Sequence, residues 1–150
     1  MKLQAWRIVK QKHAATAFSG EGARLYGGRW NSPGVSLVYT SSTQALAVLE
    51  SLVHLNPPVV FQYAVIPLEF DDALVEKVTS LPPGWHAQPA PPSVRTVGDL
   101  WAREARSAVL QVPSAIVPTE YNYLLNPAHP DFPRITLGRP APFSFDPRFL

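Results

Sequence analysis

The stretch Gly27-Gly28-Arg29-Trp30-Asn31 is the most informative segment of this sequence. Tyr39 lies ten residues after Arg29, and Glu50 lies eleven residues after Tyr39. The paired glycines predict a tight turn or a close approach of a ligand to the backbone, while the segments around Tyr39 and Glu50 predict a strand and a helix. A cation, an aromatic ring and a carboxylate thus stand on three successive elements. This set is suited to holding an anionic nucleotide, stacking on a flat ring and stabilising a developing positive charge.

Strands are predicted on both sides of this segment. Apolar and β-branched residues predict them at residues 3–9, 35–40, 59–66 and 134–137. Between Pro67 and about Arg95, acidic residues and prolines predict long loops.

Two separated helices are also predicted. The first runs from Thr43 to Leu55, with Ser42 as its N-cap, and Asn56-Pro57-Pro58 ends it. Its apolar residues cover most of its circumference, so we expect this helix to be well buried. The second begins at Thr96 or Gly98, and its buried stripe is predicted to contain Leu100, Trp101, Ala105, Ala108 and Val109. Because strands and helices do not alternate regularly, the sequence predicts an α+β fold.

Composition favours one globular domain over residues 1–150. The absence of cysteine excludes disulfides and thiolate sites. The sequence has neither a secretory signal nor an apolar run of about 20 residues that could span a membrane, so a cytoplasmic location is expected. The net charge is +2, but residues 1–30 carry six basic residues against Glu21 alone, which indicates that this N-terminal segment faces an anion or a solvated surface.

Glu50 is the pivotal candidate, because a carboxylate within an apolar helix is costly to bury unless it is paired or hydrogen-bonded. One interpretation is structural, with His54 one turn later or an arginine as its partner. The other is catalytic, with the carboxylate stabilising an oxocarbenium-like transition state. Only one well-placed acid is evident, which disfavours an ordinary two-carboxylate glycosidase.

Other chemistries find less support in the sequence. The four histidines lack the spacing of a zinc site, so no metal site is predicted. Neither of the common glycine-rich phosphate loops is present, and no Gly-x-Ser-x-Gly motif supports a serine hydrolase. Taken singly, Arg29, Tyr39 and Ser114 could each be an ordinary structural residue.

Taken together, these motifs resemble the RES-domain family, which is named for an Arg, a Glu and a Ser. The matching segments are Gly-Gly-Arg29-Trp-Asn with Gly34, Val38-Tyr39-Thr40-Ser41, the helix with Ala45 and Glu50, Val112-Pro113-Ser114, Asn122 and Asn126-Pro127. The resemblance extends from about Trp6 to Leu137. It implies a toxin of a bacterial toxin–antitoxin pair with an Xre-type antitoxin as partner, and a fold like that of ADP-ribosyltransferases.

The resemblance also implies that NAD is the substrate and that its bond to nicotinamide is broken without a permanently bound cofactor or a metal. Arg29 would then bind NAD, Tyr39 would stack on nicotinamide, and Glu50 would stabilise the cationic ribose. Ser114 would orient a ribose or phosphate oxygen. Arg7 is a further candidate for an anion cleft, and Gly28 and Asn31 are expected to contact the substrate.

Several questions stay open at this point. The acceptor of the ADP-ribosyl group could be water, phosphate or a protein side chain. The chain could be a monomer or a homodimer, and the surface that meets an antitoxin is not indicated. A distant alternative is a non-catalytic nucleic-acid-binding module, but the basic residues do not form one helix or stripe. We therefore expect no direct nucleic-acid partner.

Overall fold

Eight strands form one curled sheet in the computed structural model, which describes residues 1–54 and 62–149. The strands are β1 (Lys2–Lys10), β2 (Val38–Ser41), β3 (Tyr63–Asp71), β4 (Val75–Lys77), β5 (Val109–Pro113), β6 (Tyr121–Leu125), β7 (Thr136–Leu137) and β8 (Ala141–Phe143). Their order is β4-β5-β6-β2-β1-β3-β7, with β8 also paired to β3. The pairs are antiparallel except for β4 with β5. The predicted α+β class is confirmed.

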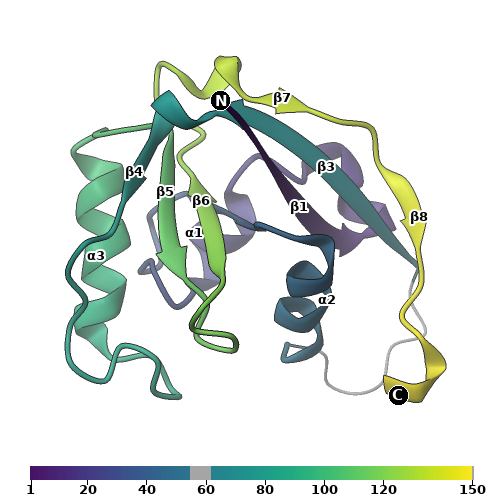
Figure 1. The fold of residues 1–150 in the computed structure, drawn as a ribbon, viewed down its shortest axis with the longest axis horizontal. Coiled ribbons are helices and arrows are strands. Elements are labelled where there is room, and N and C mark those ends of the chain that lie inside the picture. Colours follow the sequence, from purple (N-terminus) through teal and green to yellow (C-terminus); the bar gives the residue numbers. More distant parts are fainter. Residues whose placement is uncertain (55–61, 150) are drawn as a thin grey trace.

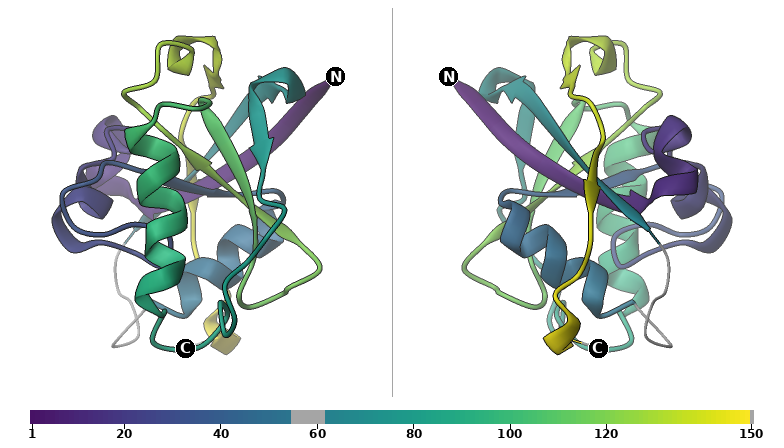
Figure 2. Two further views of the ribbon diagram at one scale, coloured as in Figure 1. Left: turned by 90° about the vertical axis from the view of Figure 1, so that its left-hand side faces the viewer. Right: turned by 90° about the vertical axis from the view of Figure 1, so that its right-hand side faces the viewer.

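The sheet divides into two halves where β1 meets β2. β1 pairs with β3 from Lys2 to Lys10, whereas its register with β2 consists of the pair Trp6 and Ser41. Figures 1 and 2 show the β1–β3 half turned away from the β5–β6 half, and in Figure 1 helix α2 (Gln44–Leu52) lies between the lower ends of the two halves. This divergence of β1 from β2 leaves space between strands that would otherwise be paired.

Helix α2 is less buried than predicted. Thr43, and not Ser42, is its N-cap, and the Thr43 side chain accepts a hydrogen bond from Leu46 N. Within the helix Leu46 and Ala47 are buried, but Leu49 is 37% exposed. The physical reason is that only one face of α2 packs against β1 and β2. The predicted end at residues 55–58 lies outside the described residues.

Helix α3 (Pro92–Arg103) begins earlier than predicted and ends sooner. Pro92 is tolerated at the start because a first-turn residue needs no backbone donor. Gly98 packs against the backbone of Trp30, since an added Cβ would lie 1.9 Å from Trp30 O. Of the expected stripe, Trp101 is buried in the helix, but Leu100 is 48% exposed. Ala105 is exposed and Ala108 is buried, both beyond the end of the helix, and Val109 belongs to β5.

Three segments differ from the predicted strands and loops. β3 continues through Pro67 into the region expected to be a loop, and the Pro67 carbonyl accepts a hydrogen bond from Gly138 N. β6 was not predicted, because its asparagine and the following Asn126-Pro127 resemble turn signals. The short helix α1 (Glu21–Tyr26) lies within residues 14–31, which we call the glycine-rich segment. Of the predicted strand at 59–66, residues 59–61 lie outside the described residues.

Alternate residues of β5 and β6 face two separate cores, as the two-residue period of a strand requires. Val109 and Leu125 belong to one core, with Phe70 and Ala5. On the opposite face, the second core consists of Trp30, Val35, Leu37, Val94, Trp101, Leu110, Val112 and Leu124. Asn122 is two residues before Leu124, so it lies on the face of the sheet that carries the second core. Within the described residues, no helix is long and apolar enough to cross a bilayer.

Candidate active site

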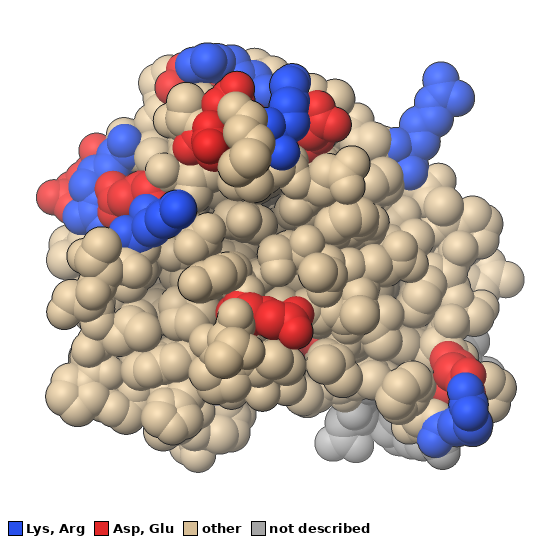
Figure 3. Space-filling model, in the orientation of Figure 1, with Lys and Arg blue, Asp and Glu red and all other residues tan. Residues whose placement is uncertain are grey.

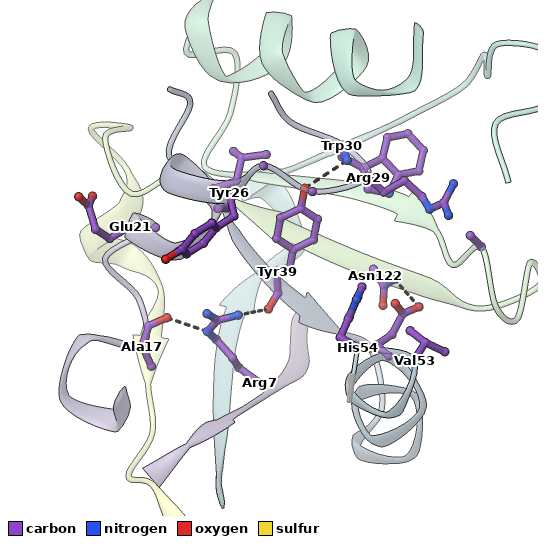
Figure 4. Close-up of a pocket in the computed structure, with 18 of the residues that line it drawn as sticks. Arg7, Ala17, Glu21, Tyr26, Arg29, Trp30, Tyr39, Val53, His54 and Asn122 are labelled. Atoms are coloured by element: carbon purple, nitrogen blue, oxygen red, sulfur yellow. Dashed lines mark hydrogen bonds between the residues drawn. The ribbon is translucent and has the colours of Figure 1, made fainter. Parts of the chain in front are cut away.

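A cavity of about 800 Å³ opens beside the junction between β1 and β2. Its volume falls within the range of about 300–1,000 Å³ that is typical of small-molecule sites. The residues that line it include Arg7, Gly28, Arg29, Tyr39, Glu50, Val53, His54, His86, Gln88, Ile116 and Asn122. Figure 4 shows labelled side chains from β1 (Arg7), the glycine-rich segment (Arg29), β2 (Tyr39), the turn after α2 (His54) and β6 (Asn122). Five predicted site residues, Arg7, Gly28, Arg29, Tyr39 and Glu50, are therefore brought to one cavity.

Glu50 is held by neutral hydrogen-bond donors. Its Oε1 atom accepts from Ser114 Oγ at 2.8 Å and from Asn122 Nδ2 at 3.0 Å. None of the ion pairs between described residues involves Glu50, so neither His54 nor an arginine is its partner in this part of the chain. Among the described residues, two hydrogen bonds fix the carboxylate and no ion pair cancels its charge.

The donors of Glu50 are themselves fixed. Ser41 Oγ donates to Asn122 Oδ1 at 2.8 Å, and the two residues are direct partners in the β2–β6 register. This bond orients the Asn122 amide so that its nitrogen points to Glu50. The Ser114 hydroxyl accepts bonds from the backbone N–H groups of Ile116 and Val117, at 3.1 and 3.0 Å. Every member of this network thus has a defined donor or acceptor role.

Ser114 and Asn31 lie behind the cavity wall. Both are completely buried and neither lines the cavity. The structure thus places these two predicted site residues behind the wall and not in it. Ser114 donates to Glu50. Asn31 holds the loop, because its Nδ2 atom donates to the carbonyls of Ala23 and Val35 at 2.9 and 3.0 Å.

Tyr39 is fixed at both ends. Its hydroxyl accepts from Trp30 N at 3.1 Å and donates to Asn31 Oδ1 at 2.5 Å, while its backbone carbonyl accepts from Arg7 Nη1 at 2.8 Å. Burial raises the pKa of Tyr39 above its usual range, so the hydroxyl stays protonated. Gly28 is required by this packing, because a Cβ there would lie 2.6 Å from the Tyr39 hydroxyl oxygen. The ring is thus held rigidly at the cavity wall.

Arg7 is a cation inside the cleft. Its Nε atom donates to Ala17 O at 2.6 Å, and both of its bonds go to neutral carbonyls. Burial lowers the pKa of Arg7 to about 10, because the charged form loses its hydration. Figure 4 shows Arg7 beneath Tyr39, with His54 standing between Tyr39 and Asn122. Within residues 1–54 and 62–149 no carboxylate pairs with Arg7, so an anionic ligand would supply its counter-charge.

Arg29 connects the glycine-rich segment to the loop before α3. Its Nη1 atom donates to Trp85 O and Ala87 O at 3.0 and 2.8 Å, and its Nη2 atom donates to Gln88 Oε1 at 2.8 Å. In Figure 4 the Arg29 guanidinium extends away from Tyr39. A guanidinium has five N–H donors, and three of those of Arg29 are used in these bonds, so two are left. Arg29 therefore anchors this loop as well as lining the site.

The basic residues of the first thirty positions do not form one surface. Arg7 and Arg29 line the cavity, whereas Arg24 pairs with Glu21 and Lys2 pairs with Glu69. On the face shown in Figure 3, basic and acidic side chains are mixed along the upper edge, and most of the centre is uncharged. In the described part of the chain, no group of three or more His, Cys, Asp or Glu residues could hold a metal ion.

Asn122 and His54 are site residues whose roles the sequence reasoning missed. Asn122 donates to Glu50, and His54 lines the cavity one helical turn after Glu50. The spacing of His54 from Glu50 was visible, but it suggested pairing between the two and not a shared cavity. For Asn122, a polar residue between apolar neighbours in the sequence Tyr121–Leu125 was the available signal.

The sequence matches known proteins over nearly its whole length. Residues 4–146 match the family described as "RES domain". "Prs ADP-ribosylating toxin" of Sphingobium sp. (strain YBL2) is 41% identical over 158 residues, covering 100% of this chain and 98% of that protein. "Toxin Res" of Yersinia enterocolitica serotype O:8 / biotype 1B is 36% identical over 150 residues, covering 97% and 99%.

The fold is also similar to a solved structure. A chain in the crystal structure of the M. tuberculosis MbcT-MbcA toxin-antitoxin complex superposes with a TM-score of 0.74 at 17% sequence identity. The match covers 96% of this chain and 85% of the other. At this identity the likeness concerns the fold, whereas the family follows from the sequence matches over nearly the whole length. The chain belongs to the RES-domain family.

Proposed function

We propose that this protein is the toxin of a toxin–antitoxin pair and that it consumes NAD by breaking the bond between nicotinamide and ribose. The observation that carries the proposal is the Glu50 carboxylate, which neutral donors hold at the wall of a cavity that also contains two arginines. The relatives named toxins match nearly the whole chain, which supports the same role here.

The chemistry of the bond explains why this site suits it. When the bond breaks, its electron pair leaves with the nicotinamide nitrogen, and the ribose carbon acquires positive charge. A fixed carboxylate interacts more strongly with that cationic sugar than with the ground state, so it lowers the barrier. Because Ser114 and Asn122 position Glu50 before the reaction, no rearrangement is needed at that moment.

The rest of the cavity suits the other parts of NAD. The Tyr39 ring would stack on the nicotinamide ring and hold it in line for departure. Arg7 and Arg29 would offset the negative charge of the diphosphate, because guanidinium groups suit phosphate oxygens. These three side chains come from different elements, so a bound dinucleotide would connect β1, β2 and the glycine-rich segment.

A second candidate is transfer of ADP-ribose from NAD to a protein. The specific observation that favours it is the name of the Sphingobium relative, "Prs ADP-ribosylating toxin". The same bond to nicotinamide breaks in both reactions, and only the acceptor differs. The partner that neutralises the toxin would be an Xre-type antitoxin, and the toxin–antitoxin complex with a similar fold supports a protein partner.

The substitution Glu50→Gln tests the proposal. Glutamine keeps the shape and the Oε1 acceptor for Ser114 and Asn122 but removes the negative charge. Loss of one transition-state stabilising group costs roughly 10²–10³-fold in rate. We expect purified Glu50→Gln protein to lose NAD-consuming activity by about this factor while its melting temperature changes little. In bacteria, its expression should no longer arrest growth.

Glu69→Gln is the matched control. Glu69 lies on β3 in an exposed pair with Lys2 at 3.5 Å and does not line the cavity, so this variant should consume NAD like the parent. Mass spectrometry of the products separates the candidates, since free ADP-ribose and a mass gain on protein name different acceptors. NAD consumption by Glu50→Gln at the parental rate would show that the role given to Glu50 is wrong.

A further inference from the structure

The cavity continues beyond Tyr39 and Arg7 to helix α1. Tyr26, the last residue of this helix, lines it together with those two residues. Figure 4 shows Tyr26 on the opposite side of Tyr39 from His54 and Asn122, with Arg7 below the two tyrosines. The end of the cavity at α1 is therefore the one farther from the groups that hold the catalytic carboxylate.

Tyr26 presents a bare aromatic ring at this end. It is 83% exposed, the largest exposed fraction among the large hydrophobic side chains that the structure describes. Within residues 1–54 and 62–149, no hydrogen bond or ring contact joins its side chain to another residue. Single exposed apolar side chains are common on protein surfaces, but this one lies in the wall of a cavity. Its ring surface is thus open to a ligand.

The backbone at Tyr26 is well fixed. Gly27 ends α1 with a φ of 72°, a conformation that favours glycine. The Gly27 N–H group donates to Ala23 O at 2.8 Å, which closes the last turn of the helix. A ligand that stacks on the Tyr26 ring would therefore have to order only one side chain and no backbone, which keeps the entropic cost of binding low.

The surroundings of Tyr26 suit a flat group without charge. Small residues of the glycine-rich segment line the cavity here and leave room for a ring; they include Ala17, Ser19, Gly20 and Ala23. The acidic residue in this part of the wall, Glu21, forms an ion pair with Arg24. Because this pair cancels the charge of Glu21, the α1 end of the cavity favours a neutral base over a phosphate.

We propose that the Tyr26 ring is the platform on which the adenine of NAD stacks, and that it makes the site select the dinucleotide over nicotinamide mononucleotide. This inference rests on the proposed function. NAD carries two flat rings on either side of its diphosphate. With nicotinamide against Tyr39 and the diphosphate beside Arg7, the adenine extends away from Glu50, toward α1. Stacking of a base on an aromatic side chain strengthens binding by about 5- to 100-fold.

Tyr26→Ala tests the platform by comparing two substrates. We expect kcat/KM for NAD to fall at least about fivefold. For nicotinamide mononucleotide, which has the same scissile bond but lacks adenine, kcat/KM should stay at the parental value. Tyr26→Phe should keep the parental preference for NAD, because it retains the ring. Since the side chain is exposed, its removal should change the melting temperature little.

Leu25→Ala is the matched control. Leu25 precedes Tyr26 in α1 and is also exposed, but it does not line the cavity, so this variant should treat both substrates like the parent. A readout that needs no turnover is calorimetric titration with ADP-ribose, which contains the adenine and the diphosphate. Its Kd should rise at least about fivefold in Tyr26→Ala and stay parental in Leu25→Ala and Tyr26→Phe.

The outcomes separate this inference from the proposed function. If the parent consumes NAD and Tyr26→Ala consumes it with the same kcat/KM, the adenine platform is wrong and the proposed function stands. An equal loss for NAD and for nicotinamide mononucleotide also overturns the platform, because the side chain would then act on something other than adenine. If the parent does not consume NAD at all, the proposed function fails, and the ADP-ribose titration alone decides whether Tyr26 binds adenine.

Discussion

Gly28→Ala tests the geometry that holds Tyr39 at the cavity wall. An added Cβ would lie 2.6 Å from the Tyr39 hydroxyl oxygen, 2.9 Å from Cζ of the ring and 3.1 Å from Asn31 Oδ1. The first two distances are shorter than any ordinary carbon contact. The ring cannot retreat freely, because its hydroxyl is bonded to Trp30 N and Asn31 Oδ1. The substitution must therefore displace Tyr39 or break these bonds.

The expected cost follows from this clash. Overpacking a well-packed site costs about 1–3 kcal/mol of stability. For a chain of this size, each kcal/mol lowers the melting temperature by about 2–4 °C. We expect Gly28→Ala to melt roughly 3–10 °C below the parent and to show a raised KM for NAD, since the stacking surface has moved. Scanning calorimetry or a thermal shift gives the first quantity, and a steady-state NAD assay gives the second.

Gly22→Ala is the control for adding a methyl group. Gly22 lies in α1, and no heavy atom comes within 4 Å of a Cβ built there. Because alanine is the better helix former by about 0.5–1 kcal/mol, this variant should be at least as stable as the parent and equally active.

A double-mutant cycle with Tyr39→Phe identifies the clashing atom. Removing the hydroxyl relieves the 2.6 Å contact but leaves the ring carbon at 2.9 Å. Gly28→Ala should therefore destabilise Tyr39→Phe less than it destabilises the parent, by at least about 0.5 kcal/mol. The reasoning is refuted if Gly28→Ala leaves both melting temperature and KM unchanged, or if the two substitutions are strictly additive.

Two further predictions concern the groups around the cavity. Asn122→Ala removes a donor to the charged Glu50. Since such a bond contributes about 1.5–3 kcal/mol, kcat should fall roughly 10- to 100-fold with little change in KM. An unchanged kcat would show that Asn122 does not position Glu50. Burial raises the pKa of Tyr39, so the folded state binds this proton more tightly than the unfolded state does. The contribution of Tyr39 to the free energy of unfolding is therefore present below about pH 10 and is lost as the pH rises further. The free energy of unfolding of the parent, measured relative to that of Tyr39→Phe, should therefore decrease between pH 9 and 11 in urea titrations, whereas a difference independent of pH would contradict the burial of this hydroxyl.

The sequence predicted the cavity better than it predicted the elements around it. Arg29, Tyr39 and Glu50 were recognised by their order and spacing, and they do reach one cavity. Residues next to them in the chain allowed this prediction, because paired glycines, a β-branched segment and a helical pattern each indicate the local backbone structure. Element limits fared worse. Pro67 lies within β3 because pairing on both sides of that strand outweighs the missing donor of a single proline.

The partners of Glu50 could not be predicted from spacing alone. Ser114 and Asn122 are 64 and 72 residues away in sequence, and only the pairing of β5 with β6 brings them together. Local reasoning favoured His54, since a residue one helical turn away is the nearest candidate. The charge pattern offered a clue that local reasoning did not use, because Glu50 is the one charged residue between Arg29 and Glu69.

That isolation of Glu50 has a physical consequence for the site. In a segment with several charges, a buried carboxylate would be neutralised by a neighbouring cation, and its field at the ribose carbon would be weak. Here the carboxylate is satisfied by a serine hydroxyl and an asparagine amide, which are dipoles and not charges. Dipoles fix the position of the oxygen while its negative charge is retained for the developing cation. The cations Arg7 and Arg29 instead come from β1 and the glycine-rich segment, where they can act on a ligand without pairing to Glu50. Under the proposed function, placing the negative charge on α2 and the positive charges on β1 and the glycine-rich segment would let one cavity attract an anion and stabilise a cation.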